Sequence, residues 1–82
     1  MSKKLYVGNL RDDTTEDDLR ELFSVYGMVI SVVIKRDSVT GVPWGYGFVV
    51  METNEAANAA VKSANGQMMR ERRIKVDEMV TY

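Results

Sequence analysis

Aromatic rings and glycines gather in the segment from residue 44 to 51, which reads WGYGFVVM. The chain has one Trp, four Tyr and two Phe, and this segment holds Trp44, Tyr46 and Phe48. An aromatic ring that is not buried in a core can stack against another flat group. The segment therefore lies wholly inside the core or presents some of its rings to a flat partner.

Charged side chains form two local runs, although the net charge of the chain is only -1. Residues 12–21, DDTTEDDLRE, hold six acids and one base, and residues 70–75, RERRIK, hold four bases and one acid. Either run can be a solvated face. Because the overall balance gives no signal for nucleic acid, contact with a polyanion must depend on local groups such as the basic run.

Several classes of site are excluded by composition. The chain has no Cys and no His, which removes thiolate metal sites, disulfides and the usual general base of an enzyme. We therefore expect no catalysis, no metal and no cofactor. The longest apolar run is far shorter than the roughly 18 residues of a membrane span, and MSKK leads directly into a strand pattern. These features predict a single intracellular domain over 1–82 with no membrane contact, in either the cytoplasm or the nucleus.

Four segments have the alternation or β-branched content of strands, and they cover residues 4–9, 29–35, 44–51 and 72–76. The first places Leu5 and Val7 on one face. The last places Ile74 and Val76 inward, with outward side chains from Arg73, Lys75 and Asp77. Residues 36–43 contain the only proline of the chain and predict a loop.

Two helices are predicted between these strands. Thr15 precedes three acidic residues and starts a helix over 16–26, which Gly27 ends as a left-handed residue. Thr53 caps a second helix over 54–64. Both have apolar side chains at i, i+3, i+4 and i+7: Leu19, Leu22, Phe23 and Tyr26 in the first, and Ala57, Ala60, Val61 and Ala64 in the second.

The order β-α-β-β-α-β predicts an α+β, ferredoxin-like sandwich, a four-stranded antiparallel sheet with two helices on one face. Period two then sends Tyr6, Tyr46 and Phe48 to the other, open face. A wetted sheet face normally carries polar residues, so three rings there need a reason. One possible reason is ring packing across the strands, covered by the C-terminal residues EMVTY; the other is a flat ligand.

Two segments resemble the signature strands of the RNA recognition motif family, namely LYVGNL at 5–10 and WGYGFVVM at 44–51. The helix end at Gly27, the DSVTG turn and the Asn65-Gly66 step also fall where that family has them. The resemblance covers nearly the whole chain. It implies one RNA recognition motif domain over 1–82, with the first and third strands at the centre of the sheet.

The resemblance also implies roles for particular side chains. Tyr6 and Phe48 would each stack one base of a single-stranded RNA, and Tyr46 would pack between nucleotides. Gly45 and Gly47 would let the backbone and a nucleotide come close. Lys35, Arg73 and Lys75 would project on the same open face and contact phosphates or base edges. About two to four phosphate contacts are expected, drawn from Lys4, Lys35, Arg36, Arg73 and Lys75. Asn9 either hydrogen-bonds a base or holds the loop after the first strand.

The chain departs from the family pattern at the start of the second signature, where Trp44 replaces the usual Lys or Arg. The loop before it has no charge after Asp37. Trp44 is therefore an additional stacking platform or an apolar contact for a protein. Met51 replaces the last aromatic residue of the signature, but it faces the core, where Met packs readily.

Two functions follow from these observations. The first is a non-catalytic, single-stranded RNA-binding module that grips bases by stacking on the open face. The alternative is a protein-interaction module of the same fold, which uses the apolar loop from Val39 to Trp44 or the acidic first helix. A monomer is expected in either case. The base preference, and the choice between RNA and single-stranded DNA, are not encoded in these patterns.

Overall fold

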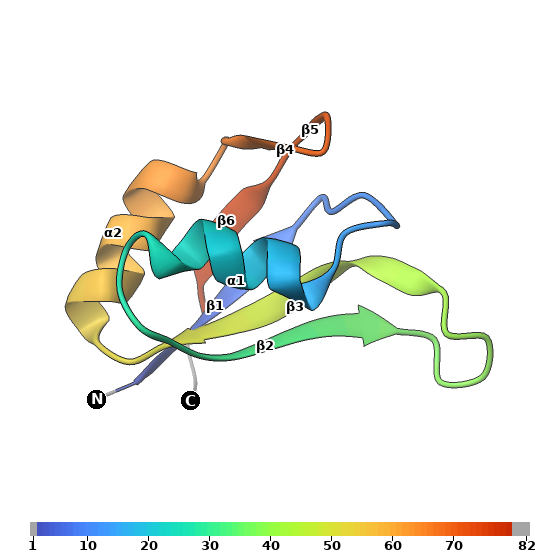
Figure 1. Cartoon of the computed structure of the whole chain (residues 1–82), viewed down its shortest axis with the longest axis horizontal. Helices are drawn as coiled ribbons and strands as arrows, with labels where there is room; N and C mark the ends of the chain where they lie inside the picture. The colour runs from blue at the N-terminus through green and yellow to red at the C-terminus, as the bar shows by residue number, and fades with distance from the viewer. Residues whose placement is uncertain (1, 80–82) are drawn as a thin grey trace.

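The computed structural model describes residues 2–79 and has the predicted ferredoxin-like architecture. Four antiparallel strands lie in the order β2-β3-β1-β6, with β1 at Lys3–Gly8, β2 at Val29–Arg36, β3 at Pro43–Met51 and β6 at Lys75–Glu78. Helices α1, Glu16–Ser24, and α2, Asn54–Ala64, cover one face of this sheet (Figure 1). The predicted central position of the first and third strands is confirmed.

Helix α1 begins as predicted but ends two residues early, at Ser24. Its capping box is complete, because Thr15 Oγ1 accepts the Asp18 N–H at 3.1 Å and Asp18 Oδ2 accepts the Thr15 N–H at 2.9 Å. After the helix, the Tyr26 N–H donates to the Phe23 carbonyl in a tighter turn.

Gly27 is not the left-handed helix cap that the sequence predicted. Its φ of +151° lies far from the left-handed helical value near +57°. A Cβ at Gly27 would lie 2.6 Å from the Cβ of Ala56. The glycine therefore lets the turn after α1 pass close to α2, which is a tertiary requirement and not a capping one.

Helix α2 spans the predicted residues, and the Thr53 side chain accepts the Ala56 N–H at 3.1 Å as its N-cap. Its buried positions are all alanines: Ala56, Ala57, Ala60 and Ala64. Small side chains let the helix lie close to the sheet, but each one buries little apolar area. More of the burial must therefore come from the larger residues of α1 and the strands.

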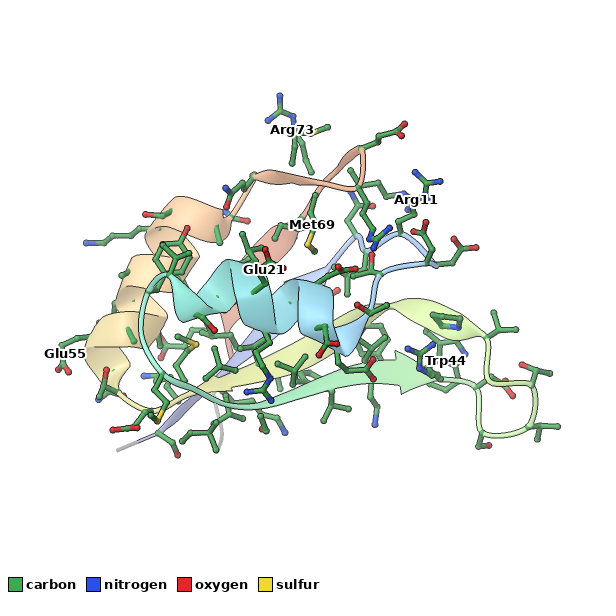
Figure 2. All side chains as sticks on the ribbon, in the orientation of Figure 1. Arg11, Glu21, Trp44, Glu55, Met69 and Arg73 are labelled. Carbon is green, nitrogen blue, oxygen red and sulfur yellow. The ribbon has the colours of Figure 1, made fainter. Side chains whose placement is uncertain are left out.

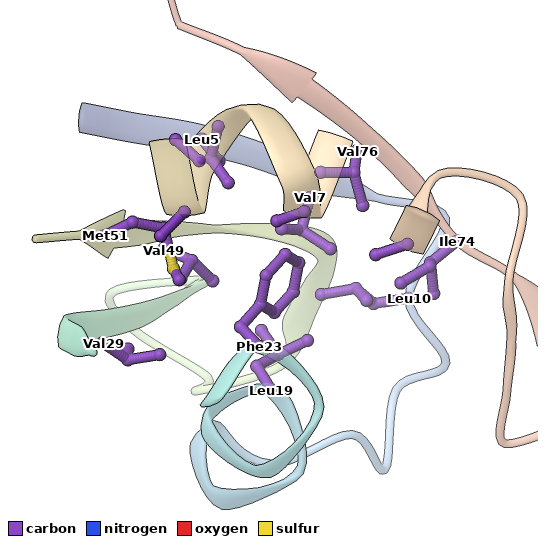
Figure 3. Packing of buried hydrophobic residues seen from close by; sticks show 14 of the residues in the cluster. Leu5, Val7, Leu10, Leu19, Phe23, Val29, Val49, Met51, Ile74 and Val76 are labelled. Carbon is purple, nitrogen blue, oxygen red and sulfur yellow. The ribbon is translucent and has the colours of Figure 1, made fainter. Parts of the chain in front are cut away.

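Phe23 provides the largest of the fully buried side chains (Figure 3). It projects from α1 and lies among Leu19, Val7 and Leu10 in the same cluster. The strands contribute the other large apolar side chains, Leu5, Val29, Ile34, Val49, Met51 and Val76, and Ile74 joins them from the link between β5 and β6. This one core explains why α1 and the sheet face it covers are apolar at the predicted positions.

The predicted single strand over 72–76 is wrong. Arg72–Arg73 forms β5, which pairs with β4, Met68–Met69, in a separate two-stranded hairpin, and β6 starts only at Lys75. The tip of the hairpin consists of Arg70 and Glu71 with φ of +47° and +68°, a mirror-image turn that suits the twist of a hairpin. Ile74 and Val76 nevertheless point into the core as predicted.

The loop between β2 and β3 is slightly shorter than predicted, because Arg36 and Pro43 belong to the strands. Its turn is closed by the Asp37 carboxylate, which accepts the N–H groups of Val39 at 2.8 Å and Thr40 at 3.0 Å. These hydrogen bonds lower the pKa of Asp37, and the bond from the Thr40 N–H has the larger effect of the two. The alternative in which EMVTY covers the open face involves residues 80–82, which lie outside the described residues.

Candidate nucleic-acid interface

Three aromatic side chains lie together on the sheet face opposite the helices, and we refer to Tyr6, Tyr46 and Phe48 as the ring cluster. Tyr6 on β1 is directly paired with Phe48 on β3. Their neighbours Leu5 and Val49 point the other way and are fully buried, whereas all three rings are partly exposed. The predicted division of β1 and β3 between two faces is therefore confirmed.

The rings contact one another as a continuous surface. The ring centroids of Tyr6 and Tyr46 are 5.8 Å apart with 29° between the planes. Phe48 packs edge-on, with its centroid 6.5 Å from that of Tyr6 and 5.9 Å from that of Tyr46. These are favourable aromatic geometries, in which each ring stabilises the position of its neighbours. The cluster is thus an ordered apolar platform at the centre of the sheet.

Gly8 supports this platform, and the sequence analysis did not identify its role. A Cβ at Gly8 would lie 2.7 Å from Cζ and 2.8 Å from Cε1 of Tyr6, and would also collide with the hydroxyl oxygen. The Tyr6 ring therefore lies along β1, over the bare backbone of Gly8. The sequence does contain a signal for this role, because Tyr6 and Gly8 are two positions apart and therefore lie on the same face of the strand.

Gly47 serves the other face. A Cβ there would collide with the Val33 carbonyl oxygen and lie 3.1 Å from the Ile34 Cα. The absence of a side chain at Gly47 therefore lets β2 and β3 approach each other. The prediction that it admits a nucleotide is replaced by this packing role.

Lysines surround the ring cluster on the open face. Lys4 Nζ lies 4.9 Å from the centroid of Phe48, a cation–π distance. Lys35 is exposed next to buried Ile34, so it projects from β2 on the open face. Lys75 lies on β6, where it is directly paired with Gly8 of β1. Since β2 and β6 are the two outer strands, positive charge lies on both sides of the platform.

Asn9 and Arg73 are bonded within the protein. Asn9 has φ of +57°, and its Nδ2 donates to the Arg73 carbonyl oxygen at 2.8 Å, which ties the end of β1 to β5. Nη1 of Arg73 donates to the Gly66 carbonyl at 3.1 Å. The loop-holding role predicted as one option for Asn9 is therefore present. Arg73 belongs to the hairpin and not to the four-stranded sheet of Lys35 and Lys75 (Figure 2).

Trp44, at the start of β3, is 56% exposed (Figure 2). It lines a groove of about 600 Å³ together with Arg11 and Arg72 from the neighbouring loop and hairpin. The strand is irregular here, because Gly45 has φ of +85° and its carbonyl accepts the Leu10 N–H at 2.8 Å. Trp44 therefore belongs to the strand that carries Tyr46 and Phe48, and it also lines a separate, partly basic groove.

The basic run is partly neutralised by the acidic run. Arg70 contacts Asp18 at 2.7 Å and Asp13 at 3.6 Å, and Arg11 contacts Asp13 at 3.2 Å. The hydrogen bond from Arg70, followed by that from the Thr15 N–H, lowers the pKa of Asp18, and Asp18 raises the pKa of Arg70. Such exposed pairs contribute little stability. They do lower the positive charge that the hairpin presents to a polyanion.

Arg36 is also paired, since its Nη2 lies 3.4 Å from Glu16 Oε1 at the start of α1. Of the five predicted phosphate contacts, Lys4, Lys35 and Lys75 are the ones on the open face, while Arg36 and Arg73 are engaged elsewhere.

Residues 2–79 contain no group of three or more Cys, His, Asp or Glu side chains placed to hold a metal ion. Over the same range, no helix is both long and apolar enough to span a membrane.

Comparison with known proteins agrees with this geometry. The model of the RNA recognition motif matches residues 5–75. Glycine-rich RNA-binding protein 1 of Mycosarcoma maydis is 42% identical over 77 residues, which are 94% of this chain and 44% of that protein. The chain thus spans less than half the length of this relative.

Two solved structures have a closely similar fold. The crystal structure of RNA binding protein PG1 has a TM-score of 0.92 at 35% identity, and the aligned region covers 98% of this chain and 96% of that one. The Sxl-lethal protein/RNA complex also has a TM-score of 0.92, at 32% identity, and covers 100% of this chain and 49% of its own. The chain belongs to the RNA recognition motif family, whose members are RNA-binding and non-catalytic.

Proposed function

We propose that this domain binds single-stranded RNA as a monomer by stacking unpaired bases on the ring cluster. The observation that carries the proposal is the contiguous set of three partly exposed rings at the centre of the open face. Unpaired bases are flat and apolar on both faces, so they fit such a surface better than a duplex or a typical peptide does. The solved complex of a similar chain with RNA supports the same ligand class.

The roles of the individual side chains are part of this proposal; the family resemblance implies them and the contacts between the rings support them. Tyr6 and Phe48 each stack one base, and Tyr46 packs between the two nucleotides. The lysines on either side of the platform neutralise phosphates, which positions the strand without reading its sequence. Stacking contributes roughly 1–3 kcal/mol per base, offset by the cost of ordering the RNA. We therefore expect micromolar binding, about -8 kcal/mol.

The test is a titration with a mixed pool of short single-stranded RNAs, followed by Trp and Tyr fluorescence. Tyr6→Ala and Phe48→Ala should each weaken binding about tenfold, because each removes one stacking platform. Tyr6→Phe is the matched control, since it keeps the ring and should bind RNA nearly as well as the parent. If the alanine variants fold and bind RNA like the parent, the stacking proposal is wrong.

A protein-binding role is favoured by one observation, the apolar loop before β3. Val39 is 91% exposed, and Val42 and Trp44 are 56% exposed. Exposed apolar side chains of this kind gather at protein interfaces. Trp44→Lys separates the two roles. Tighter RNA binding with a steeper salt dependence would place residue 44 beside the phosphates, whereas unchanged RNA binding with loss of a protein contact would favour the second role.

A further inference from the structure

Asp77 is an acidic residue of the open face, where the described residues also include the ring cluster and three lysines. Asp77 on β6 is directly paired with Tyr6 on β1. Paired residues of antiparallel strands point to the same face, with Cβ atoms roughly 4.5–5.5 Å apart. The adjacent Val76 points the other way and is only 2% exposed. Asp77 therefore lies on the open face next to Tyr6, within reach of the edge of a base stacked on that ring.

The carboxylate of Asp77 also has spare acceptor capacity. Its Oδ1 accepts the N–H of Glu78 at 2.8 Å. Within residues 2–79, it makes no ion pair with a Lys or Arg, unlike its neighbour Glu78, which contacts Lys3 at 2.6 Å. A carboxylate accepts hydrogen bonds through two oxygens, so Oδ2 remains available to a ligand.

A carboxylate at this place lowers the affinity for a polyanion unless a base contact compensates for the repulsion. Because it is an acceptor only, it favours bases that present donors along the exposed edge. Guanine presents two adjacent donors, N1–H and the N2 amino group. Adenine and cytosine each present one amino group, and uracil presents a single N–H between two carbonyl oxygens.

We propose that Asp77 determines specificity, selecting guanine at the position stacked on Tyr6. The inference rests on the proposed stacking function and adds a base preference that stacking alone does not supply, since every base has a flat face. The order of preference is guanine first, then adenine and cytosine, and uracil last.

The experiment uses RNA pentamers of uridine in which only the central base varies, as guanine, inosine, adenine, cytosine or uracil. Inosine lacks the N2 amino group of guanine and is otherwise the same, so the ratio of the two affinities isolates one donor. The parent protein should bind the guanine pentamer on the order of tenfold more tightly than the uracil pentamer. It should also bind the inosine pentamer several-fold more weakly than the guanine pentamer.

Asp77→Asn is the informative variant, because it removes the charge and keeps the shape of an exposed side chain. In this variant, the ratio of the affinities for the guanine and inosine pentamers should fall close to one. This holds even if the affinity for all RNA rises because the repulsion from the carboxylate is lost. Asp17→Asn is the matched control: Asp17 is also exposed but lies in α1 on the helix side, so the same charge change should leave the ratio intact.

An unchanged guanine-to-inosine ratio in Asp77→Asn would overturn the inference, as would equal binding of the guanine and uracil pentamers by the parent. Neither result affects the proposed function, which is tested by Tyr6→Ala. If the parent bound none of the pentamers, both the proposed function and the role of Asp77 would be rejected.

Discussion

The two faces of β3 are built from alternate residues of one strand, yet they have different physical tasks. Val49 and Met51 are fully buried under the helices. Tyr46 and Phe48 remain partly exposed and contact other rings on the opposite side. One face stabilises the fold and the other is the proposed binding surface. Substitutions on the two faces should therefore affect different measurements, and four predictions test this separation.

The largest effect is expected in the core. Phe23→Ala should destabilise the domain by about 3–5 kcal/mol, because it leaves a cavity among large residues while the buried positions of α2 are all alanines, which are too small to fill it. Native domains have roughly 5–15 kcal/mol in total, and a chain of 82 residues belongs at the low end of this range, so much of the protein should unfold. Urea denaturation followed by circular dichroism measures this change. A loss as large for Phe48→Ala would show that the two faces are not separable.

Gly47→Ala tests the core-side packing of β2 against β3. The new methyl group would meet backbone atoms of Val33 and Ile34, which cannot rotate away as a side chain can. We expect a loss of about 1–3 kcal/mol in the free energy of unfolding, typical of overpacking. Chemical denaturation gives the value, and a loss below about 0.5 kcal/mol would mean that the two strands separate easily.

Gly8→Ala is the counterpart on the open face. Its methyl group would meet the far end of the Tyr6 side chain, which can swing aside, so stability should change little. The displaced ring should weaken RNA binding by about 1 kcal/mol, part of one stacking interaction. RNA affinity and unfolding free energy should be measured for both glycine variants. We expect Gly8→Ala to lower mainly the affinity and Gly47→Ala to lower mainly the stability. An unfolding defect in Gly8→Ala without a binding defect would contradict this expectation.

The smallest effect concerns charge. With two to four phosphate contacts, the slope of log K against log salt should be shallow, about -1.5 to -3, because each contact on a single strand contributes roughly -0.7. Lys75→Ala should reduce the slope by about 0.7 and leave base preference mostly unchanged. RNA titrations between low and high salt measure both slopes. A parent slope much steeper than about -4 would mean that charge and not stacking dominates binding.

Local patterns in the sequence were sufficient for most of the architecture and for the ring cluster. Period two assigned Tyr6, Tyr46 and Phe48 to one face, and Thr15 and Thr53 marked both helix starts. These features depend on residues a few positions apart, where side-chain direction and capping follow from the backbone alone. The same reasoning failed at the hairpin of β4 and β5, since Arg70 and Glu71 adopt positive φ values that neither residue type favours.

The sequence by itself thus determined the order of the two helices and the four strands of the main sheet, the side chains on each face of β1 and β3, and the absence of His and Cys chemistry. Only the tertiary structure decided which charges remain free for a ligand. Arg70 meets Asp18, 52 residues away, and Asn9 binds the carbonyl of Arg73, 64 residues away. It also placed Asp77 beside Tyr6 through the pairing of the first and last strands. Contacts of this kind depend on the register of distant strands, which no local pattern specifies.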